Sequence, residues 1–277
     1  MSSRGGALVT GAGGGLGREI ATRLGAAGFH VLVTDVDGAA AHAAAAEISA
    51  AGDAATGLEL DVRDQGAMRR AARAAVEAAG SLALWVNNAG ILLTGPVWEQ
   101  DDAQRRLMFE VNALGTMHGT VAALEVMRPA RTGHIINVGS LAGLVSVPGE
   151  GVYAATKHAV VGLSTSTLAD LRAAGEREVH ISCICPDGMW TPMLHDKLDD
   201  PQASMSFSGQ LLQPEDVADA VLRLVDRPRP VLALPRWRGV EVRLFDLVPG
   251  LAMRAVPLVV RMSRVQQRAA ARRLRNT

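Results

Sequence analysis

Residues 7–17 read Ala-Leu-Val-Thr-Gly-Ala-Gly-Gly-Gly-Leu-Gly, an apolar run that passes directly into a glycine-rich loop. Leu16, Ile20 and Leu24 then recur at helical spacing, so the stretch predicts a strand, a tight turn and a helix. Glycines in such a turn let backbone N–H groups approach a pyrophosphate at the N-terminus of the helix. The spacing is T-G-x-x-x-G-x-G rather than G-x-G-x-x-G, and in this context it predicts a dinucleotide-binding turn.

An acidic residue, Asp35, stands where the second strand of the chain should end. Its carboxylate can accept hydrogen bonds from both hydroxyls of an adenosine ribose. The 2′-phosphate of NADP would bring like charge beside it, which at ~4 Å and an effective dielectric near 20 costs about 4 kcal/mol. The nearby Gly14 and Val36 cannot pair with a phosphate, and Arg18 is the nearest basic candidate. The sequence therefore predicts NAD(H) as the cofactor.

Short apolar runs alternate with helical stretches along the rest of the chain. Strands are expected at residues 7–9, 31–33, 58–60, 82–86, 135–138, 181–185 and 231–234. Helices are expected at residues 16–24, 39–51, 65–79, 152–171 and 214–225, with a further long helical stretch that runs through Asn112. Strands that alternate with helices indicate βαβ units. The predicted fold class is α/β, a doubly wound, Rossmann-like parallel sheet of about seven strands with helices on both faces.

The domain organisation follows from the absence of an internal linker or repeat. We expect a single Rossmann-type domain over residues 1–240 and a C-terminal extension over residues 241–277 that is first apolar and then arginine-rich. The apolar part, residues 244–262, is interrupted by Pro249 and Pro257. It could cover a substrate cleft, form a subunit interface or lie on a membrane surface, and the sequence leaves these three alternatives open.

Composition excludes several classes of protein. Of the 277 residues 48% are hydrophobic and 20% charged, which excludes a mainly disordered chain. The only two cysteines, Cys183 and Cys185, provide neither a disulfide framework nor a zinc site, so we expect no metal and a reduced, cytoplasmic compartment. We expect no secretion signal, because no charged region followed by an apolar one opens the chain. No apolar run reaches the ~18 residues of a membrane span.

The charge is unevenly distributed along the chain. The formal net charge is +0, yet residues 227–277 hold 12 arginines against only Glu241 and Asp246. A basic segment suggests contact with an anionic partner, whereas a solvated helix face or a subunit contact is the simpler explanation. We expect no nucleic acid partner, and a peripheral membrane contact through this arginine-rich C-terminus is the further alternative.

Tyr153 is the only tyrosine in the chain, and Lys157 is one of only two lysines. Their four-residue spacing places both side chains on one face of a helix. A phenol is a poor base at its free pKa of ~10, but an ammonium group beside it in a partly water-excluded site lowers that value. The pair therefore predicts a proton-transferring site, with Lys157 lowering the pKa of Tyr153. Ser140, after the fifth strand, could hydrogen-bond a substrate oxygen.

Taken together, these motifs resemble the compact, single-domain branch of the short-chain dehydrogenase/reductase family, from about Ala7 to about Leu234. Each motif falls at the expected strand end or on the expected helix. The motifs are TGAGGGLG at 10–17, Asp61-Val62, Asn87-Asn88-Ala89-Gly90, Asn112, Ser140, Tyr153-Ala-Ala-Thr-Lys157, and Pro186 with Thr191. One departure is Asp187, since members of this family usually have Pro-Gly before the threonine.

The resemblance implies an NAD-dependent enzyme that transfers a hydride between NAD(H) and an apolar secondary alcohol or ketone. It implies that Tyr153 is the general acid/base, that Lys157 tunes it and binds the ribose, that Ser140 orients the substrate and that Asn112 holds a proton relay. It places the cofactor against Gly11, Gly15, Leu16, Gly17, Asp35, Asp61, Val62, Asn88, Ala89, Gly90, Tyr153, Lys157, Pro186 and Thr191.

The substrate side is expected to be apolar. The candidate lining residues are Leu141, Ala142, Val147, Pro148, Met189, Trp190 and Met193. Residues 192–212 are polar and lack a strong period, as expected for a lid that closes over a substrate. We expect a small apolar substrate and a homodimer or homotetramer.

Two other functions remain open. A 3-oxoacyl-thioester reductase would require a basic patch beside the cleft, which the C-terminal arginines could supply. A non-enzymatic dinucleotide sensor would be expected to lack Tyr153 or Lys157, and both are present.

Overall fold

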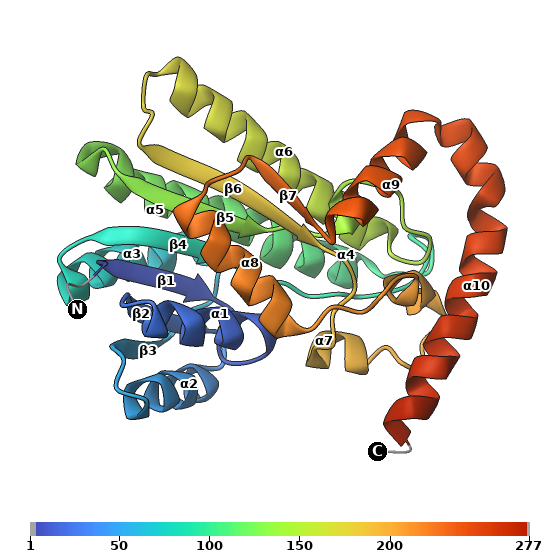
Figure 1. Cartoon of the computed structure of the whole chain (residues 1–277), viewed down its shortest axis with the longest axis horizontal. Helices are drawn as coiled ribbons and strands as arrows, with labels where there is room; N and C mark the ends of the chain where they lie inside the picture. Colours follow the sequence, from blue (N-terminus) through green and yellow to red (C-terminus); the bar gives the residue numbers. More distant parts are fainter. Residues whose placement is uncertain (1–3, 276–277) are drawn as a thin grey trace.

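The structure is a computed structural model that describes residues 4–275 (Figure 1). Its described part contains a seven-stranded sheet in the order β3-β2-β1-β4-β5-β6-β7, and every adjacent pair is parallel. The strands are β1 (Gly6–Thr10), β2 (His30–Asp35), β3 (Ala55–Glu59), β4 (Leu82–Asn87), β5 (Gly133–Val138), β6 (Val179–Pro186) and β7 (Val231–Leu234). The predicted α/β fold class is confirmed.

Helices connect the strands and continue beyond the last one. The first group is α1 (Gly15–Ala26), α2 (Gly38–Ala50), α3 (Gln65–Ala79), α4 (Asp102–Met108), the π-helical η1 (Phe109–Gly115) and α5 (Thr116–Ala130). The second group is η2 (Leu141–Gly143), α6 (Gly151–Ala173), α7 (Pro192–His195), η3 (Pro201–Phe207), α8 (Pro214–Asp226), α9 (Arg236–Leu247) and α10 (Pro249–Arg275).

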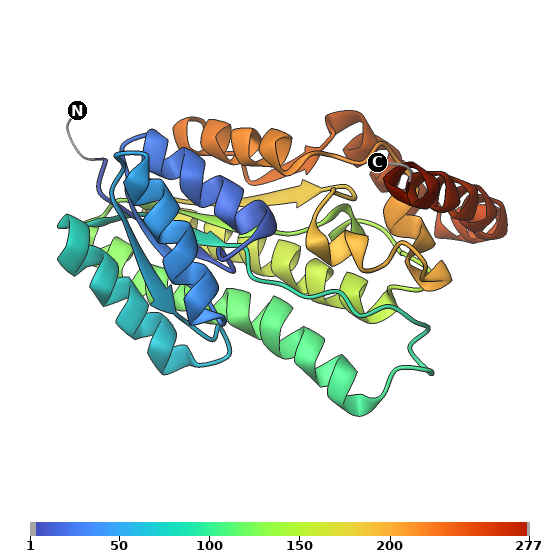
Figure 2. The same cartoon turned by 90° about the horizontal axis from the view of Figure 1, so that it is seen from below.

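The helices form two layers around the sheet (Figure 2). Alternate residues of β1 show why, because Ala7 and Val9 pack with α1, α2 and α8, whereas Leu8 packs with α3, α5 and α6. Both sets are fully buried, as period-2 alternation requires of a strand covered on both faces. Trp85 of β4 is the largest fully buried side chain and lies in the second layer.

The starts of two predicted elements differ most from the structure. β3 begins at Ala55, three residues before the predicted start, because this edge strand pairs through its backbone with β2 and is only half-buried. The long helical stretch through Asn112 begins only at Asp102, where Asp101 and Gln104 form a capping box. At Phe109 the helix widens to π-type, a local irregularity that is frequent at functional sites.

A buried polar network crosses the centre of the sheet. Trp85 Nε1 donates to Asn87 Oδ1 at 2.7 Å, and Asn87 Nδ2 donates to Asn137 Oδ1 at 2.8 Å. Asn137 Nδ2 in turn donates to Ser164 Oγ at 2.9 Å, which ties β4 and β5 to α6. Buried polar groups that are satisfied in this way fix one register between the elements they join.

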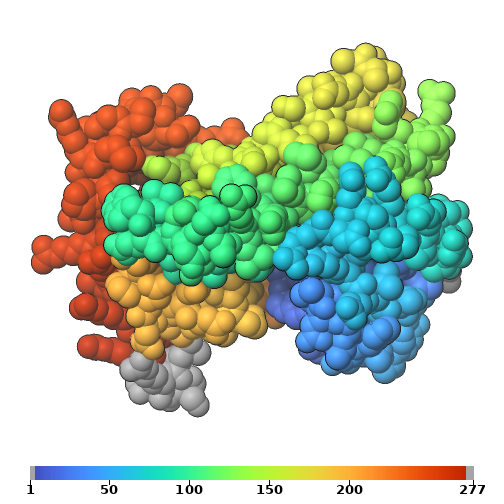
Figure 3. Space-filling model, turned by 180° about the vertical axis from the view of Figure 1, so that it is seen from behind, coloured from blue at the N-terminus to red at the C-terminus, as the bar shows by residue number. Residues whose placement is uncertain are grey.

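The C-terminal extension forms an arm at one end of the molecule (Figures 1 and 3). The predicted boundary after residue 240 falls inside α9, which packs on β7. α10 then runs along η3, where Gln267 Nε2 donates to the carbonyl oxygens of Lys197 at 2.9 Å and Asp200 at 2.7 Å. No helix among residues 4–275 is long and apolar enough to cross a bilayer.

The buried polar network around Trp85 and Asn87 leaves no room for a side chain at Gly119 of α5. A Cβ at this position would lie 2.7 Å from Trp85 Nε1 and closer still to Asn87 Oδ1. Gly119→Ala is therefore expected to lower the free energy of unfolding by about 1–3 kcal/mol in urea titrations. The control is Gly162→Ala on α6, where nothing lies within 4 Å of the new Cβ, so stability should rise by about 0.4–1 kcal/mol. Equal effects of the two substitutions would contradict the role of the network.

Candidate active site

A cavity of about 880 Å³ lies at the carboxyl ends of the parallel strands. It extends from the glycine loop after β1, past the ends of β4, β5 and β6, to the inner side of α9 and α10. The ends of parallel strands are where an open α/β sheet binds its ligands, at the point where the strand order reverses. In this sheet that point lies between β1 and β4.

The glycine loop fits a dinucleotide pyrophosphate. Gly11 has φ +62, and a Cβ there would lie 2.8 Å from Ala89 Cα, so only glycine is accommodated. A Cβ on Gly17 would collide with the carbonyl oxygen of Gly11, so glycine keeps α1 close to the loop. Nothing lies within 4 Å of a Cβ built on Gly14, which leaves room for a ligand in front of the loop.

Asp35 lies at the end of β2 beside this loop, as predicted. Its Oδ2 accepts from the Gly13 amide at 2.9 Å and its Oδ1 from the Asp37 amide at 3.1 Å. These bonds fix the carboxylate at the wall of the cavity. Arg18, the basic side chain that the sequence left open, forms an ion pair with Glu47 of α2 instead.

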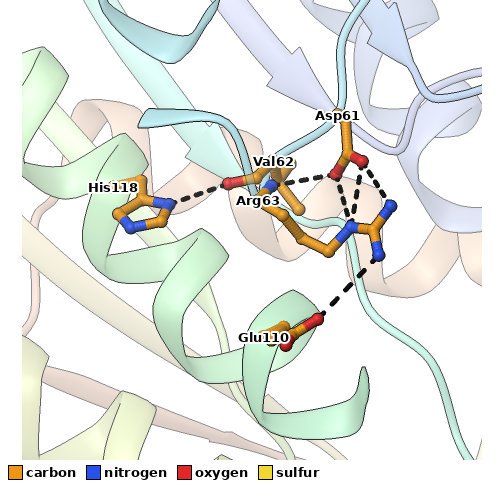
Figure 4. A network of polar contacts seen from close by, with 5 residues as sticks. All are labelled: Asp61, Val62, Arg63, Glu110 and His118. Carbon is orange, nitrogen blue, oxygen red and sulfur yellow. Dashed lines mark hydrogen bonds and ion pairs between the residues drawn. The ribbon is translucent and has the colours of Figure 1, made fainter. Parts of the chain in front are cut away.

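The end of the cavity at Asp61 contains a polar network that the sequence did not reveal (Figure 4). Arg63 donates to both oxygens of Asp61 at 2.6–3.0 Å, and its Nη1 lies 3.9 Å from Glu110. The hydrogen bond from Arg63 is the main reason that the pKa of Asp61 lies below its ordinary value. His118 Nδ1 lies 3.0 Å from the carbonyl oxygen of Val62, so Arg63 and His118 each hold one of the two predicted cofactor contacts Asp61 and Val62.

The floor of the cofactor half is held by Asn88. Its Nδ2 donates to the carbonyl oxygens of Thr10 and Gly11, both at 2.9 Å. Thr10 Oγ1 accepts from the Asn88 and Ala89 amides at 3.0 and 3.1 Å. These four bonds join the ends of β1 and β4. The predicted residues Gly11, Gly15, Leu16, Gly17, Asp35, Asp61, Val62, Asn88, Ala89, Gly90, Pro186 and Thr191 all line the cavity.

Tyr153 and Lys157 lie one turn apart on α6 and face the same cavity. Lys157 Nζ lies 5.6 Å from the centroid of the Tyr153 ring and donates to the carbonyl oxygen of Val138 at 2.9 Å. Burial lowers the pKa of Lys157 to about 8. Ser140 follows β5, accepts from the Ala142 amide at 3.1 Å and is hydrogen-bonded to Tyr153.

The pKa of Tyr153 differs from the expectation. Burial raises it above its ordinary value, the charge of Glu150 raises it further, and the hydrogen bond with Ser140 lowers it. The sequence predicted a pKa lowered through Lys157, and this direction is wrong for the protein alone. Because desolvation disfavours the phenolate, the site holds Tyr153 as a neutral phenol, the form that can donate a proton.

Glu150 is the functional candidate that sequence reasoning missed. It is almost fully buried, lines the cavity and precedes Tyr153 by three residues at the start of α6. Ser206 Oγ of η3 donates to its Oε1 at 2.6 Å. Burial raises the pKa of this carboxyl to about 7. The sequence offered one signal for Glu150, its position about one helical turn before the only tyrosine. Its burial, which is rare for a glutamate, becomes visible only in the structure.

Asn112 is fully buried in η1 but does not line the cavity. Its side chain accepts from the Ile91 amide at 2.8 Å and donates to the Ile91 carbonyl and to Thr156 Oγ1 at 2.9 and 3.1 Å. A Cβ on Gly90 would lie 3.3 Å from Asn112 Oδ1 and 3.6 Å from Lys157 Nζ, so both groups approach the same point. The role of Asn112 as a proton relay stays a prediction.

Asp187, which departs from the family pattern, faces inward rather than into solvent. Its Oδ2 accepts from Arg238 Nε of α9 at 2.9 Å. Arg238 also donates to Glu241 at 2.8 Å and to Ser208 at 3.2 Å. This largely buried pair fastens the C-terminal arm to the loop after β6, next to the predicted cofactor contact Thr191.

The substrate half of the cavity is walled by apolar side chains, as predicted. Leu141, Ala142, Val147, Pro148, Met189 and Met193 line it. Trp190 does not line the cavity, and its ring packs 5.3 Å from that of His195. α9 and α10 add Val242, Phe245, Ala252, Met253, Val256, Val259 and Met262, so the extension covers the cleft, one of the three alternatives that the sequence left open.

Known proteins resemble this chain along most of its length. The family model for short chain dehydrogenases matches residues 6–202. A cyclopentanol dehydrogenase of Comamonas sp. (strain NCIMB 9872) is 35% identical over 223 residues, which cover 79% of this chain and 88% of the relative. The 1-deoxy-11-beta-hydroxypentalenate dehydrogenase of Streptomyces exfoliatus is 37% identical over 193 residues, 68% of each chain.

A solved structure resembles it too. The short chain dehydrogenase/reductase of Burkholderia phymatum, determined in complex with NAD, superposes with a TM-score of 0.82 at 31% identity and covers 91% of this chain and 96% of its own. The family match spans more than half of the chain and includes the glycine loop, Ser140, Tyr153 and Lys157. The chain belongs to the short-chain dehydrogenase/reductase family.

Proposed function

We propose that the protein is an NAD(H)-dependent dehydrogenase that interconverts an apolar secondary alcohol and its ketone. The observation that carries the proposal is the place of Tyr153, Ser140 and Lys157, between the polar half of the cavity at the glycine loop and its apolar half at α9 and α10. The relatives named for cyclopentanol and hydroxypentalenate oxidation support a cyclic, largely hydrocarbon alcohol.

The residues divide the chemistry between them. When bound, NAD(H) supplies the hydride acceptor or donor and, in the oxidised form, a positively charged ring. Ser140 orients the substrate oxygen beside the Tyr153 hydroxyl. In ketone reduction the phenol donates its proton to the carbonyl oxygen, and in alcohol oxidation the phenolate removes the hydroxyl proton. Lys157 binds the ribose, and its ammonium group favours the phenolate in this water-poor site.

A 3-oxoacyl-thioester reductase is the second candidate, and the charges around the cavity do not favour it. The two arginines that line the cavity are both neutralised by carboxylates, Arg63 by Asp61 and Arg238 by Asp187 and Glu241. Neither arginine inside the cavity is left for an acidic carrier, so such a carrier would have to be held by the exposed arginines of α10 outside it. The cavity wall instead offers mostly hydrocarbon and thioether groups.

We also propose a homodimer or homotetramer in a reducing cytoplasm. α4, η1 and α5 expose the apolar side chains Leu107, Phe109, Leu114 and Met117 within one stretch of the chain, which a second copy could cover. The two cysteines are both free and buried, which is the common state in a reducing compartment.

Tyr153→Phe tests the proposed activity. Turnover is expected to fall by at least ~10²-fold, because the ring remains and only the proton carrier is lost. The measurement is the absorbance change of the nicotinamide with a panel of cyclic secondary alcohols and ketones. NAD affinity, followed by fluorescence titration, should stay within about a few-fold of the unmodified protein. Near-normal turnover of this variant would show that Tyr153 is not the general acid/base.

The position of Asp35 leads us to expect a preference between the two cofactors. The unmodified protein should prefer NAD(H) over NADP(H) by at least about tenfold in kcat/KM, since the 2′-phosphate would face a fixed carboxylate. Asp35→Ser with Val36→Arg should shift the ratio towards NADP(H). Glu47→Gln is the control, because it frees Arg18 without touching Asp35 and should leave the ratio unchanged. A ratio that changes in the control would show that Arg18 reaches the phosphate.

The titration of Glu150 is expected to affect how the rate of alcohol oxidation depends on pH. Its pKa of about 7 means that it becomes anionic as the pH rises through neutrality, which opposes ionisation of Tyr153. Glu150→Gln should therefore shift the acidic limb of the pH profile for alcohol oxidation to lower pH, by on the order of one unit. Ser206→Ala should shift it in the same direction, because the lost hydrogen bond keeps Glu150 neutral to higher pH. A shift to higher pH, or reduced turnover without a shift, would contradict this coupling.

A further inference from the structure

The outer side of the C-terminal arm carries an exposed apolar stripe, which we define as Leu251, Leu258, Met262 and Val265 of α10. These four side chains are 58–67% exposed. Their spacing of seven, four and three residues places them on one face of the helix. Leu247 and Val248, at the turn between α9 and α10, extend the stripe and are also more than half exposed.

The opposite face of α10 is the one that packs on the protein. Ser263, Gln267 and Ala271 are buried, and Val256 and Val259 line the cavity. A helix that covers a globular core ordinarily has polar residues on its outward side. The outward side of α10 is instead apolar along the stripe, and of the four side chains in the stripe only Met262 also lines the cavity.

Arginines lie along one flank of the stripe. Arg254, Arg261 and Arg268 are spaced by seven residues, which places them in a row next to Leu251, Leu258 and Val265, and all three are exposed. Arg264 and Arg272 widen this row. After Asp246 the sequence has no acidic residue, so nothing within α10 neutralises these charges. An apolar stripe beside a row of cations is the arrangement of a helix that lies flat in an anionic membrane surface.

We propose that the α9–α10 arm docks the protein on an anionic lipid bilayer, with the stripe in the headgroup region and the arginine row against lipid phosphates. A second copy of the chain fits the stripe less well. In a two-fold interface with the two α10 helices antiparallel, the arginine rows of both subunits would meet without a carboxylate partner. The exposed apolar side chains of α4, η1 and α5 offer a separate surface for self-association.

The position of the cavity agrees with this orientation. Met253 and Met262 line the cavity and are at the same time about half exposed on the arm. The cavity therefore reaches the molecular surface beside the stripe. The arm itself forms one end of the molecule (Figure 3). Docking through the stripe would place that opening at the bilayer, where apolar alcohols concentrate.

Vesicle co-sedimentation of the full chain tests the proposal. The protein should bind vesicles of phosphatidylcholine with about one-third phosphatidylglycerol at least about tenfold more tightly than vesicles of phosphatidylcholine alone. Raising the salt from about 0.1 M to about 0.5 M should weaken this binding several-fold, because exposed charges are screened. Absence of binding, or equal and salt-insensitive binding to both vesicles, would overturn the proposal.

Two pairs of variants separate the contribution of the apolar stripe to vesicle binding from that of the arginine row. Leu258→Glu with Val265→Glu should abolish vesicle binding, whereas Ala43→Glu with Ala46→Glu, exposed on the distant α2, adds the same charge and should not. Arg254, Arg261 and Arg268 changed together to Gln should weaken binding, and changed together to Lys should retain it.

Turnover of a water-soluble alcohol by all four variants serves as the folding control, since none of the substituted residues lines the cavity. Light scattering of the Leu258→Glu, Val265→Glu variant without lipid tests whether a second copy of the chain covers the stripe instead of a membrane. A fall in molar mass, with vesicle binding unchanged, would assign the stripe to a second copy of the chain and overturn the membrane proposal.

Discussion

The bonds between Thr10 and Asn88 are the constraint on which the rest of the site depends. In a sheet of order β3-β2-β1-β4-β5-β6-β7 the connections after the two central strands leave in opposite directions, which opens a crevice outside their carboxyl ends. The Asn88 amide and the Thr10 hydroxyl hold β1 and β4 together at that point. The glycine loop on one side and Tyr153 on the other are thereby fixed to one rigid frame, as hydride transfer between two bound molecules requires.

Local sequence signals were sufficient for the fold and for most of the cofactor half. Short apolar runs, glycines before a helix, and Asp35 at a strand end each depend on neighbours within a few residues, and the structure agrees with all three. The same holds for Tyr153 and Lys157, whose common face follows from helical geometry. β3 was misjudged at its start because an edge strand is held by backbone pairing and needs no continuous apolar run.

What the sequence did not reveal depends on contacts between distant segments. Arg238 reaches Asp187 across 51 positions, and Ser206 reaches Glu150 across 56. No periodicity encodes such pairs, because they arise only when the arm and η3 fold back over the strand ends. The direction of the Tyr153 pKa was missed for the same reason, since burial and the charge of Glu150 are properties of the assembled cavity.

Methionines form a large part of the cavity wall, and this composition affects both the range of substrates and the sensitivity of the enzyme to oxidation. Five of the ten methionines of the chain line the cavity, at positions 189, 193, 205, 253 and 262. Methionine is unbranched and has three rotatable bonds, so a wall built from it adjusts to ligands of different outline at little cost. The same thioethers are open to oxidation. Conversion to sulfoxides would make the wall polar and exclude hydrocarbon substrates while the proton-transfer groups stayed intact, and reductase repair would restore them.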